Sequence, residues 1–239
     1  MTENSETVLH FIGIDVQVRR GCTYAVLDSN GFLIDSGWTD KGSVENPDSM
    51  NRTIRGLVDL VEKHSKGSAE SVAVGIDAPR MPLPEKRKWY WERKTRSWRP
   101  RRSSEAGFGR HCEVIIKAHS VANPQWTPTF LMAKPWMQVG FKLFQALAIY
   151  QHVHEVFPSA SYCMLENNRD MNVQINFAHF APGPKDMLDA CMAAVTVKEF
   201  LTGHGERVGG GDGLGTIVLP RPIKCNRIEE VFIWPPETK

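Results

Sequence analysis

Two apolar runs that end in aspartate constrain the fold of this chain most strongly. Residues 8–14 precede Asp15, and residues 72–76 precede Asp77. Short apolar runs of this kind are typical of strands buried inside a sheet. Strands that each end in an acid can bring distant carboxylates together at one edge of that sheet. Because clustered carboxylates repel one another and are costly to desolvate, they usually hold a cation or a proton. We therefore expect a metal site at this edge.

The remaining patterns predict an α/β fold with one mixed sheet. Strands are expected at 8–15, 21–28, 32–38, 72–77, 154–157 and 216–219, and helices at 50–65, 137–153 and 184–201. Residues 28–31 form a hairpin turn signal, so the first three strands make an antiparallel meander. Parallel strands follow, flanked by helices. This order resembles that of the ribonuclease H-like fold. Residues 114–116 could be helix or strand.

Length and composition indicate a single globular domain over residues 1–239, with a basic aromatic insertion at about 83–105. Five cysteines without a Cys-x-x-Cys pair argue against a disulfide framework or a zinc knot. Apolar runs shorter than about 18 residues predict that the chain does not enter a membrane. Residues 1–7 are polar, which argues against a secretory signal, so we expect a cytoplasmic protein.

A second group of acids opens the expected helix 184–201. Asp186 and Asp189 lie three residues apart and share one helical face. Asp186 could simply favour the helix dipole, whereas Asp189 lies in an apolar stretch, where an acid is costly unless it is paired or metal-bound. Taken alone, Asp15 and Asp77 could be ordinary turn residues. Glu155 could be a further ligand or an edge-strand residue.

Five motifs, in this order, carry a family resemblance. They are Ile12-Gly13-Ile14-Asp15, Gly75-Ile76-Asp77-Ala78-Pro79, Glu155-Val156-Phe157-Pro158, residues 185–190 and residues 213–220. The chain resembles the DUF429 family, predicted nucleases of the ribonuclease H-like superfamily. The resemblance implies that fold and a nuclease that uses two Mg²⁺ (or Mn²⁺) ions.

By the same resemblance, Asp15, Asp77, Asp186 and Asp189 would be metal ligands and Glu155 a further catalytic residue. The last helix is similar to that of the RuvC-type resolvases, in which two acids one helical turn apart help to bind metal. Lys185 departs from the family, whose members often place a histidine before the first acid.

The basic aromatic segment 85–102 holds nine cations against two acids, interleaved with four aromatic residues. Cations pair with phosphates and aromatic faces stack on unpaired bases, so this composition suits DNA or RNA. The expected contacts are Arg87, Trp89, Trp91, Arg93, Arg96, Trp98, Arg99 and Arg101. The alternative is a solvated helix whose tryptophans pack inward. Arg110, His111 and Glu113 could add polar groups to the same cleft, although a structural role is favoured.

Three functions remain open at this point. The first is a nuclease in which metal-bound water attacks phosphorus. The second is a catalytically inactive nucleic-acid-binding or scaffold protein on the same fold. The third is an ATP-handling relative of actin and the sugar kinases, which normally need two such domains. The glycine-rich residues 209–215 precede an expected strand instead of opening a helix, so they indicate a turn rather than a phosphate loop.

Overall fold

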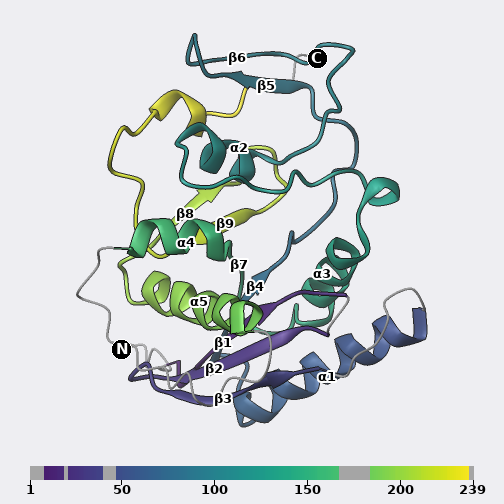
Figure 1. Ribbon diagram of the computed structural model, residues 1–239, viewed down its shortest axis with the longest axis vertical. Coiled ribbons are helices and arrows are strands. Elements are labelled where there is room, and N and C mark those ends of the chain that lie inside the picture. The colour runs from purple at the N-terminus through teal and green to yellow at the C-terminus, as the bar shows by residue number, and fades with distance from the viewer. Residues whose placement is uncertain (1–7, 19–20, 40–46, 167–183, 237–239) are drawn as a thin grey trace, which may run out of the picture.

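A seven-stranded mixed sheet forms the centre of the computed structural model, which describes residues 8–18, 21–39, 47–166 and 184–236 (Figure 1). From one edge to the other its strands are β3 (Leu33–Trp38), β2 (Thr23–Asp28), β1 (His10–Asp15), β4 (Val72–Asp77), β7 (His152–Glu155), β9 (Thr216–Leu219) and β8 (Glu206–Gly209). β1, β2 and β3 are antiparallel, whereas β4, β7 and β9 run parallel to β1. The expected α/β class and mixed sheet are confirmed.

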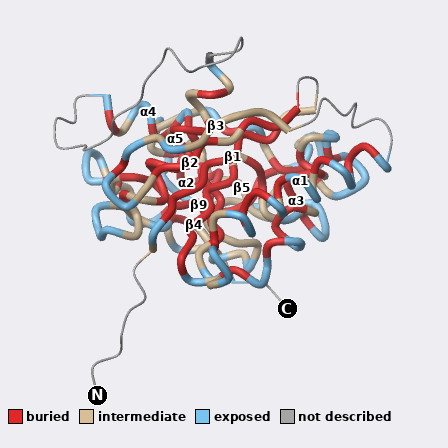
Figure 2. Tube along the Cα trace, turned by 90° about the horizontal axis from the view of Figure 1, so that it is seen from below, coloured by how far each residue is buried: buried red, intermediate tan, exposed pale blue. Residues whose placement is uncertain are grey.

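Helices cover both faces of the sheet. α1 (Pro47–Ser65) and α3 (Pro135–Ala146) pack on one face, and α5 (Pro184–Leu201) lies across β1, β2 and β4 on the other, beside α4 (Pro158–Leu165). α2 (His111–Ala118) and the short helix η3 (Glu229–Phe232) pack near β8 and β9. Figure 2 shows that buried residues concentrate along the sheet and the helix faces turned toward it.

Two glycines allow α5 to lie directly on the sheet. Ile12, Ile14 and Ile76 point to the face of α1 and α3, so the alternate residues Gly13 and Gly75 face α5. A Cβ added at Gly13 would lie 1.9 Å from a backbone oxygen of α5, and one at Gly75 would lie 2.6 Å from another. Asp15 and Asp77 come two residues after these glycines and therefore start on the same face, beneath α5.

Several elements differ from the sequence expectations. The helix expected over 137–153 ends at Ala146. The expected helix was too long because Leu147 and Tyr150, in the turn that follows, are also buried and so extend the apolar pattern. The strand expected at 154–157 begins two residues earlier, as β7. Residues 114–116 belong to α2. α4 and β8 were not expected from the sequence.

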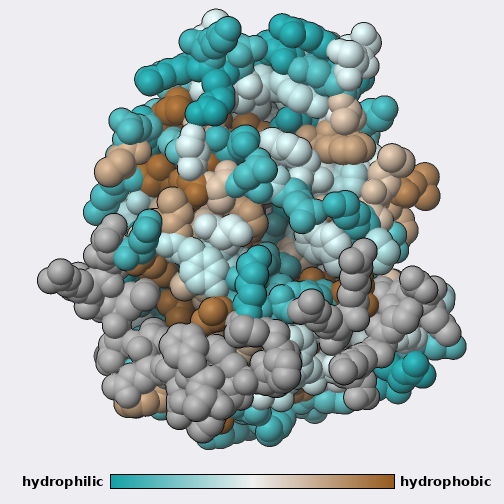
Figure 3. All heavy atoms as spheres, viewed as in Figure 1, coloured by the Kyte–Doolittle hydropathy of each residue, from teal (hydrophilic) through white to brown (hydrophobic). Residues whose placement is uncertain are grey.

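The basic aromatic segment forms a separate two-stranded sheet, so the alternative was wrong about a helix, although Trp91 and Trp98 do pack against protein, as that alternative expected. β5 (Trp89–Glu92) pairs antiparallel with β6 (Ser97–Pro100). Short strands of this kind alternate residues across two faces, and here β6 contacts η3 near the chain's C-terminal end. Figure 3 shows a largely hydrophilic surface over this hairpin, at the top of the view.

None of the helices within the described ranges has the length and apolarity that a membrane crossing requires. All five cysteines have free thiols, as their spacing predicts. Residues 1–7, on which the expectation of no secretory signal depends, lie outside the described residues.

Candidate functional site

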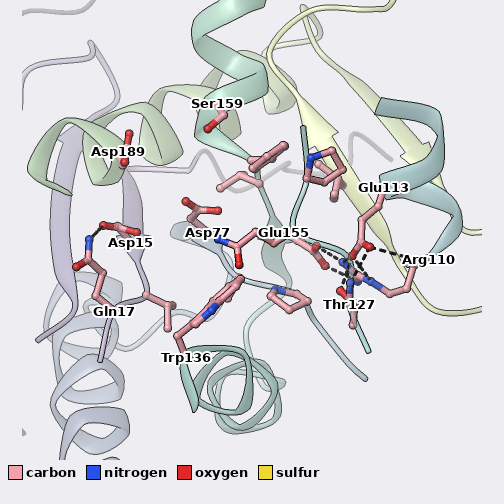
Figure 4. A pocket seen from close by; sticks show the side chains of 18 of the residues that line it. Asp15, Gln17, Asp77, Arg110, Glu113, Thr127, Trp136, Glu155, Ser159 and Asp189 are labelled. Atoms are coloured by element: carbon pink, nitrogen blue, oxygen red, sulfur yellow. Dashed lines mark hydrogen bonds and ion pairs between the residues drawn. The ribbon is translucent and has the colours of Figure 1, made fainter. Parts of the chain in front are cut away.

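A pocket of about 390 Å³ lies at the carboxyl ends of β1, β4 and β7. Asp15 from β1, Asp77 from β4 and Asp189 from α5 line one part of it. Arg110, at the start of α2, and Glu155, at the end of β7, line another. Figure 4 shows the three aspartates in the left half of the pocket and the Arg110–Glu155 pair in the right half. The structure thus brings together acids that are far apart in the sequence.

Asp15 and Asp77 are neighbours because β1 and β4 are parallel and in register. Adjacent strands lie about 4.8 Å apart, so both carboxylates leave the same face at neighbouring points. Burial raises the pKa of Asp15 to about 7, and the charges of Asp189 and Asp186 add to this, while a hydrogen bond from Gln17 opposes it. That bond joins Gln17 Nε2 to Asp15 Oδ2 over 2.7 Å.

Burial also raises the pKa of Asp77 well above its ordinary value, and the carboxylates of Asp15 and Asp189 add to the effect. Asp189 itself is half-buried on α5, and burial raises its pKa while a hydrogen bond from the Tyr162 hydroxyl opposes the change. Lys185, one turn earlier on α5, lines the same pocket and lowers the pKa of both acids. The pocket is therefore rich in negative charge that one lysine offsets only in part.

Asp186 plays a different part from Asp189. It does not line the pocket, although its charge raises the pKa of Asp15. Its backbone oxygen accepts a hydrogen bond from Thr23 Oγ1 over 2.9 Å. This bond ties the start of α5 to the start of β2.

Glu155 lies in the pocket wall, but its oxygens are occupied by protein partners. Its register partner on β4 is Ile76, so its side chain leaves the sheet on the face opposite to Asp77. Arg110 donates to both carboxylate oxygens, one of them over 2.7 Å. The backbone amide of Arg80 donates to Glu155 Oε2 over 2.8 Å. The role of Glu155 as a metal ligand stays a prediction, and the structure gives it a structural ion pair.

Arg110 is fully buried between two glutamates. Besides Glu155 it bonds Glu113 through Nε over 3.0 Å and Nη2 over 2.8 Å. Glu113 in turn accepts from Thr127 and from the Arg110 backbone amide, which caps α2. The structural role favoured for Arg110 and Glu113 is confirmed, and both also line the pocket. The sequence did not point to Gln17, Thr23 and Tyr162, which hydrogen-bond Asp15, Asp186 and Asp189. Polar residues of these types have no distinctive spacing.

The donor set suits a hard divalent cation. Aspartate oxygens are the ligands that Mg²⁺ prefers, and burial followed by mutual repulsion raises the pKa of the Asp15 and Asp77 carboxyls, so a cation bound there would relieve an unfavourable charge. Among the described residues, no three His, Cys, Asp or Glu side chains stand close enough together to hold an ion without rearrangement. Asp15, Asp77 and Asp189 would have to draw closer together to surround a cation.

The basic aromatic hairpin does not line this pocket, since no residue of 83–105 is part of its wall. Its tryptophans pack against protein: the Trp91 and Trp98 rings meet edge-on at 5.4 Å, and Trp98 Nε1 donates to the backbone oxygen of Glu230. Of the eight expected nucleic-acid contacts, Arg93 and Arg96 are exposed and the others are partly buried, namely Arg87, Trp89, Trp91, Trp98, Arg99 and Arg101.

Comparisons with known proteins complete the description of the site. Family models, curated proteins and solved structures were all searched, and none matches this chain. We therefore infer a function from the geometry of the pocket and its surroundings.

Proposed function

We propose that this chain is a metal-dependent nuclease that hydrolyses phosphodiester bonds at the aspartate pocket. The observation that carries the proposal is the meeting of Asp15, Asp77 and Asp189 from three separate elements, with the carboxyl pKa of each raised by burial. Buried like charges destabilise a fold, so a protein that gathers them has a use for a cation or a proton there. Mg²⁺ and Mn²⁺ are the cations that this donor set suits.

The sheet supports the same proposal. Three antiparallel strands followed by parallel strands, in the order β3-β2-β1-β4-β7, with a helix packed across β1 and β4, is the arrangement expected of a ribonuclease H-like fold. The sequence motifs that resemble the DUF429 family end β1 and β4 and begin α5, where the three pocket aspartates lie.

The residues of the pocket would have different roles in the reaction. Asp15, Asp77 and Asp189 would hold the metal, which when bound activates water and neutralises the phosphate. Lys185, exposed at the start of α5, adds positive charge where a phosphate would approach. The Arg110–Glu155 pair holds the wall opposite the aspartates in place.

A cleavage assay tests this function. Labelled single- and double-stranded DNA and RNA are incubated with Mg²⁺ or Mn²⁺ and with wild type, Asp77→Asn, Asp189→Asn or Asp59→Asn. Asp59 is exposed on α1, so its variant makes the same charge change away from the pocket. We expect wild type and Asp59→Asn to cleave and the two pocket variants to lose at least about 100-fold in rate. Equal cleavage by all four proteins would refute the proposal.

One observation favours the inactive binding protein as the second candidate: among the described residues, no three acidic, histidine or cysteine side chains stand close enough together to hold a metal ion. The same assay separates the two functions. Tight, salt-dependent binding without cleavage by any of the proteins, at any metal concentration, would support the binding protein.

A further inference from the structure

A second pocket, which we call the aromatic pocket, lies between the hairpin and α2. It holds about 360 Å³, within the size range of small-ligand sites. Four of its lining residues are aromatic: Tyr90 and Trp91 from β5, Phe108 from the loop before α2, and Trp126 from the loop after it. Figure 1 shows the hairpin above α2, at the end of the molecule away from α1.

The aromatic pocket is also positively charged. Arg87 lies between two of its rings, with the guanidinium carbon 4.0 Å from the centre of Tyr90 and 5.0 Å from that of Trp126. Its Nε and Nη1 are buried and have no hydrogen-bond partner among the described residues. Arg93 and Lys117 also line the pocket, and each bonds a neutral side chain rather than a carboxylate.

The one acid in the wall of the aromatic pocket is already neutralised. Glu105 accepts two hydrogen bonds from the Arg99 guanidinium and one from the backbone amide of Arg102 over 2.7 Å. Arg99 holds the pKa of Glu105 at about 2 through these bonds. The three cations of the pocket, Arg87, Arg93 and Lys117, are therefore left to attract an anion.

A third hollow, of about 340 Å³, shares lining residues with both the aromatic pocket and the aspartate pocket. It shares Phe108 and Trp126 with the aromatic pocket, and Pro124 and Gln125 with the aspartate pocket. Lys134 stands in its wall and bonds Gln125. The shared residues place this hollow, with a further cation in its wall, on the side of the aromatic pocket nearer the aspartates.

We infer that the aromatic pocket binds one unpaired base of a single-stranded nucleic acid, whose phosphates pass Arg93 and Lys117 and lead to the aspartates. This inference rests on the proposed nuclease function and narrows its substrate to strands with unpaired bases. Aromatic rings stack on any base, whereas a paired base cannot enter a pocket without leaving its duplex. The aromatic walls select the base and the cations select the phosphates.

The base is tested with two single strands of equal charge. Fluorescence anisotropy in EDTA compares a labelled 15-mer of oligothymidylate with a 15-mer of abasic sites, so that cleavage cannot interfere. We expect wild type to prefer the strand with bases on the order of 10-fold, and Phe108→Leu to lose most of that preference. Phe32→Leu, an exposed aromatic residue near the β2–β3 turn, is the matched control. Melting curves confirm that both variants are folded.

The phosphates are tested by salt dependence. The double variant Arg93→Gln/Lys117→Gln is compared with Arg52→Gln/Arg55→Gln, which removes two exposed charges from α1, outside the pocket. The slope of log Kd against log salt should fall by about 1.4 for the pocket pair, because each cation lost to a single strand removes about 0.7. The control pair should leave the slope unchanged.

Each outcome decides the inference separately from the nuclease proposal. Equal affinity for the two strands, equal slopes for the two double variants, or tighter binding of a 15-bp duplex would overturn the inference, even if the enzyme cleaves. Base-dependent binding without any cleavage would support the inference and refute the nuclease. Parallel measurements on a 15-mer of oligouridylate show whether the strand is RNA or DNA, and preference for either supports the inference.

Discussion

Asp15 offers a direct test of the idea that the pocket stores unfavourable charge. Its carboxyl is 6% exposed, and its pKa rises from an ordinary 3.8 to about 7 in the folded protein. The unfolded chain therefore loses its proton first as the pH rises. Folding stability then falls between about pH 4 and pH 7 and stays low above that range. The variant Asp15→Asn removes this loss, because an amide cannot ionise.

The magnitude follows from the pKa. A carboxyl whose pKa rises from 3.8 to about 7 lowers the free energy of unfolding by at most about 4 kcal/mol at pH 8. Water penetration and side-chain movement reduce this, so we expect Asp15→Asn to be more stable than wild type by about 1–4 kcal/mol. The amide oxygen can still accept the hydrogen bond from Gln17. In a chain of 239 residues each kcal/mol corresponds to about 2–4 °C in Tm.

Urea unfolding from pH 4 to pH 9, without metal, measures the effect. The stability difference between Asp15→Asn and wild type should be small at pH 4 and reach its full value above pH 7. Asp59→Asn, an exposed residue, should show no such trend. A difference that does not change with pH, or a variant less stable than wild type at pH 8, would refute the reasoning.

The remaining predictions concern packing and the buried ion pair. Gly13→Ala should destabilise the fold by about 3 kcal/mol or more, because the added Cβ would meet the α5 backbone. Gly56→Ala, on an open helix surface, is the control and should be neutral or stabilising by up to about 1 kcal/mol. Urea unfolding measures both variants. Arg110→Gln leaves two buried glutamates without their cation, so it should lower the free energy of unfolding by about 3–5 kcal/mol at pH 8 and by less at pH 4. Arg55→Gln, at an exposed position, should lower it little in the same titration. Equal losses in the two variants would contradict the pairing.

The strand-end acids were predictable because the signal for them is local. A short apolar run between turn residues indicates a buried strand, and register then places Asp15 beside Asp77. The sequence favoured Asp189 over Asp186 as a site residue, because an acid inside an apolar stretch is costly unless it is paired or metal-bound. Spacing puts both on one helical face, but in the folded chain Asp189 lines the pocket and Asp186 does not.

The hairpin and its pocket could not be predicted for a different reason. Residues 85–102 mix charges and aromatic rings without a period of 2 or 3.6, so no local pattern separates a strand from a helix. The partners that settle the structure are distant: Trp98 packs on His111 and Trp234, and Tyr90 bonds the backbone of Gly107. Contacts of this kind appear only once the chain is folded.

The same limit applies to Glu155. Its motif suggests an acid at a strand end, like that of Asp77. The neighbouring strand places it one register position away, so it leaves the sheet on the other face and meets Arg110. Sequence shows that a strand ends in an acid, but the pairing register determines the side to which that acid points.

The central claim is that Asp15, Asp77 and Asp189 form a site for a divalent cation, and calorimetric titration with Mn²⁺ tests it most directly. At pH 6.5 a metal must displace the proton from carboxyls with raised pKa values, so the binding heat should depend on the ionisation enthalpy of the buffer. We expect saturable binding with proton release in wild type and in Asp59→Asn, and at least about 10-fold weaker binding in Asp77→Asn and Asp189→Asn. Absence of binding by wild type, or equal affinity in all four proteins, would contradict it.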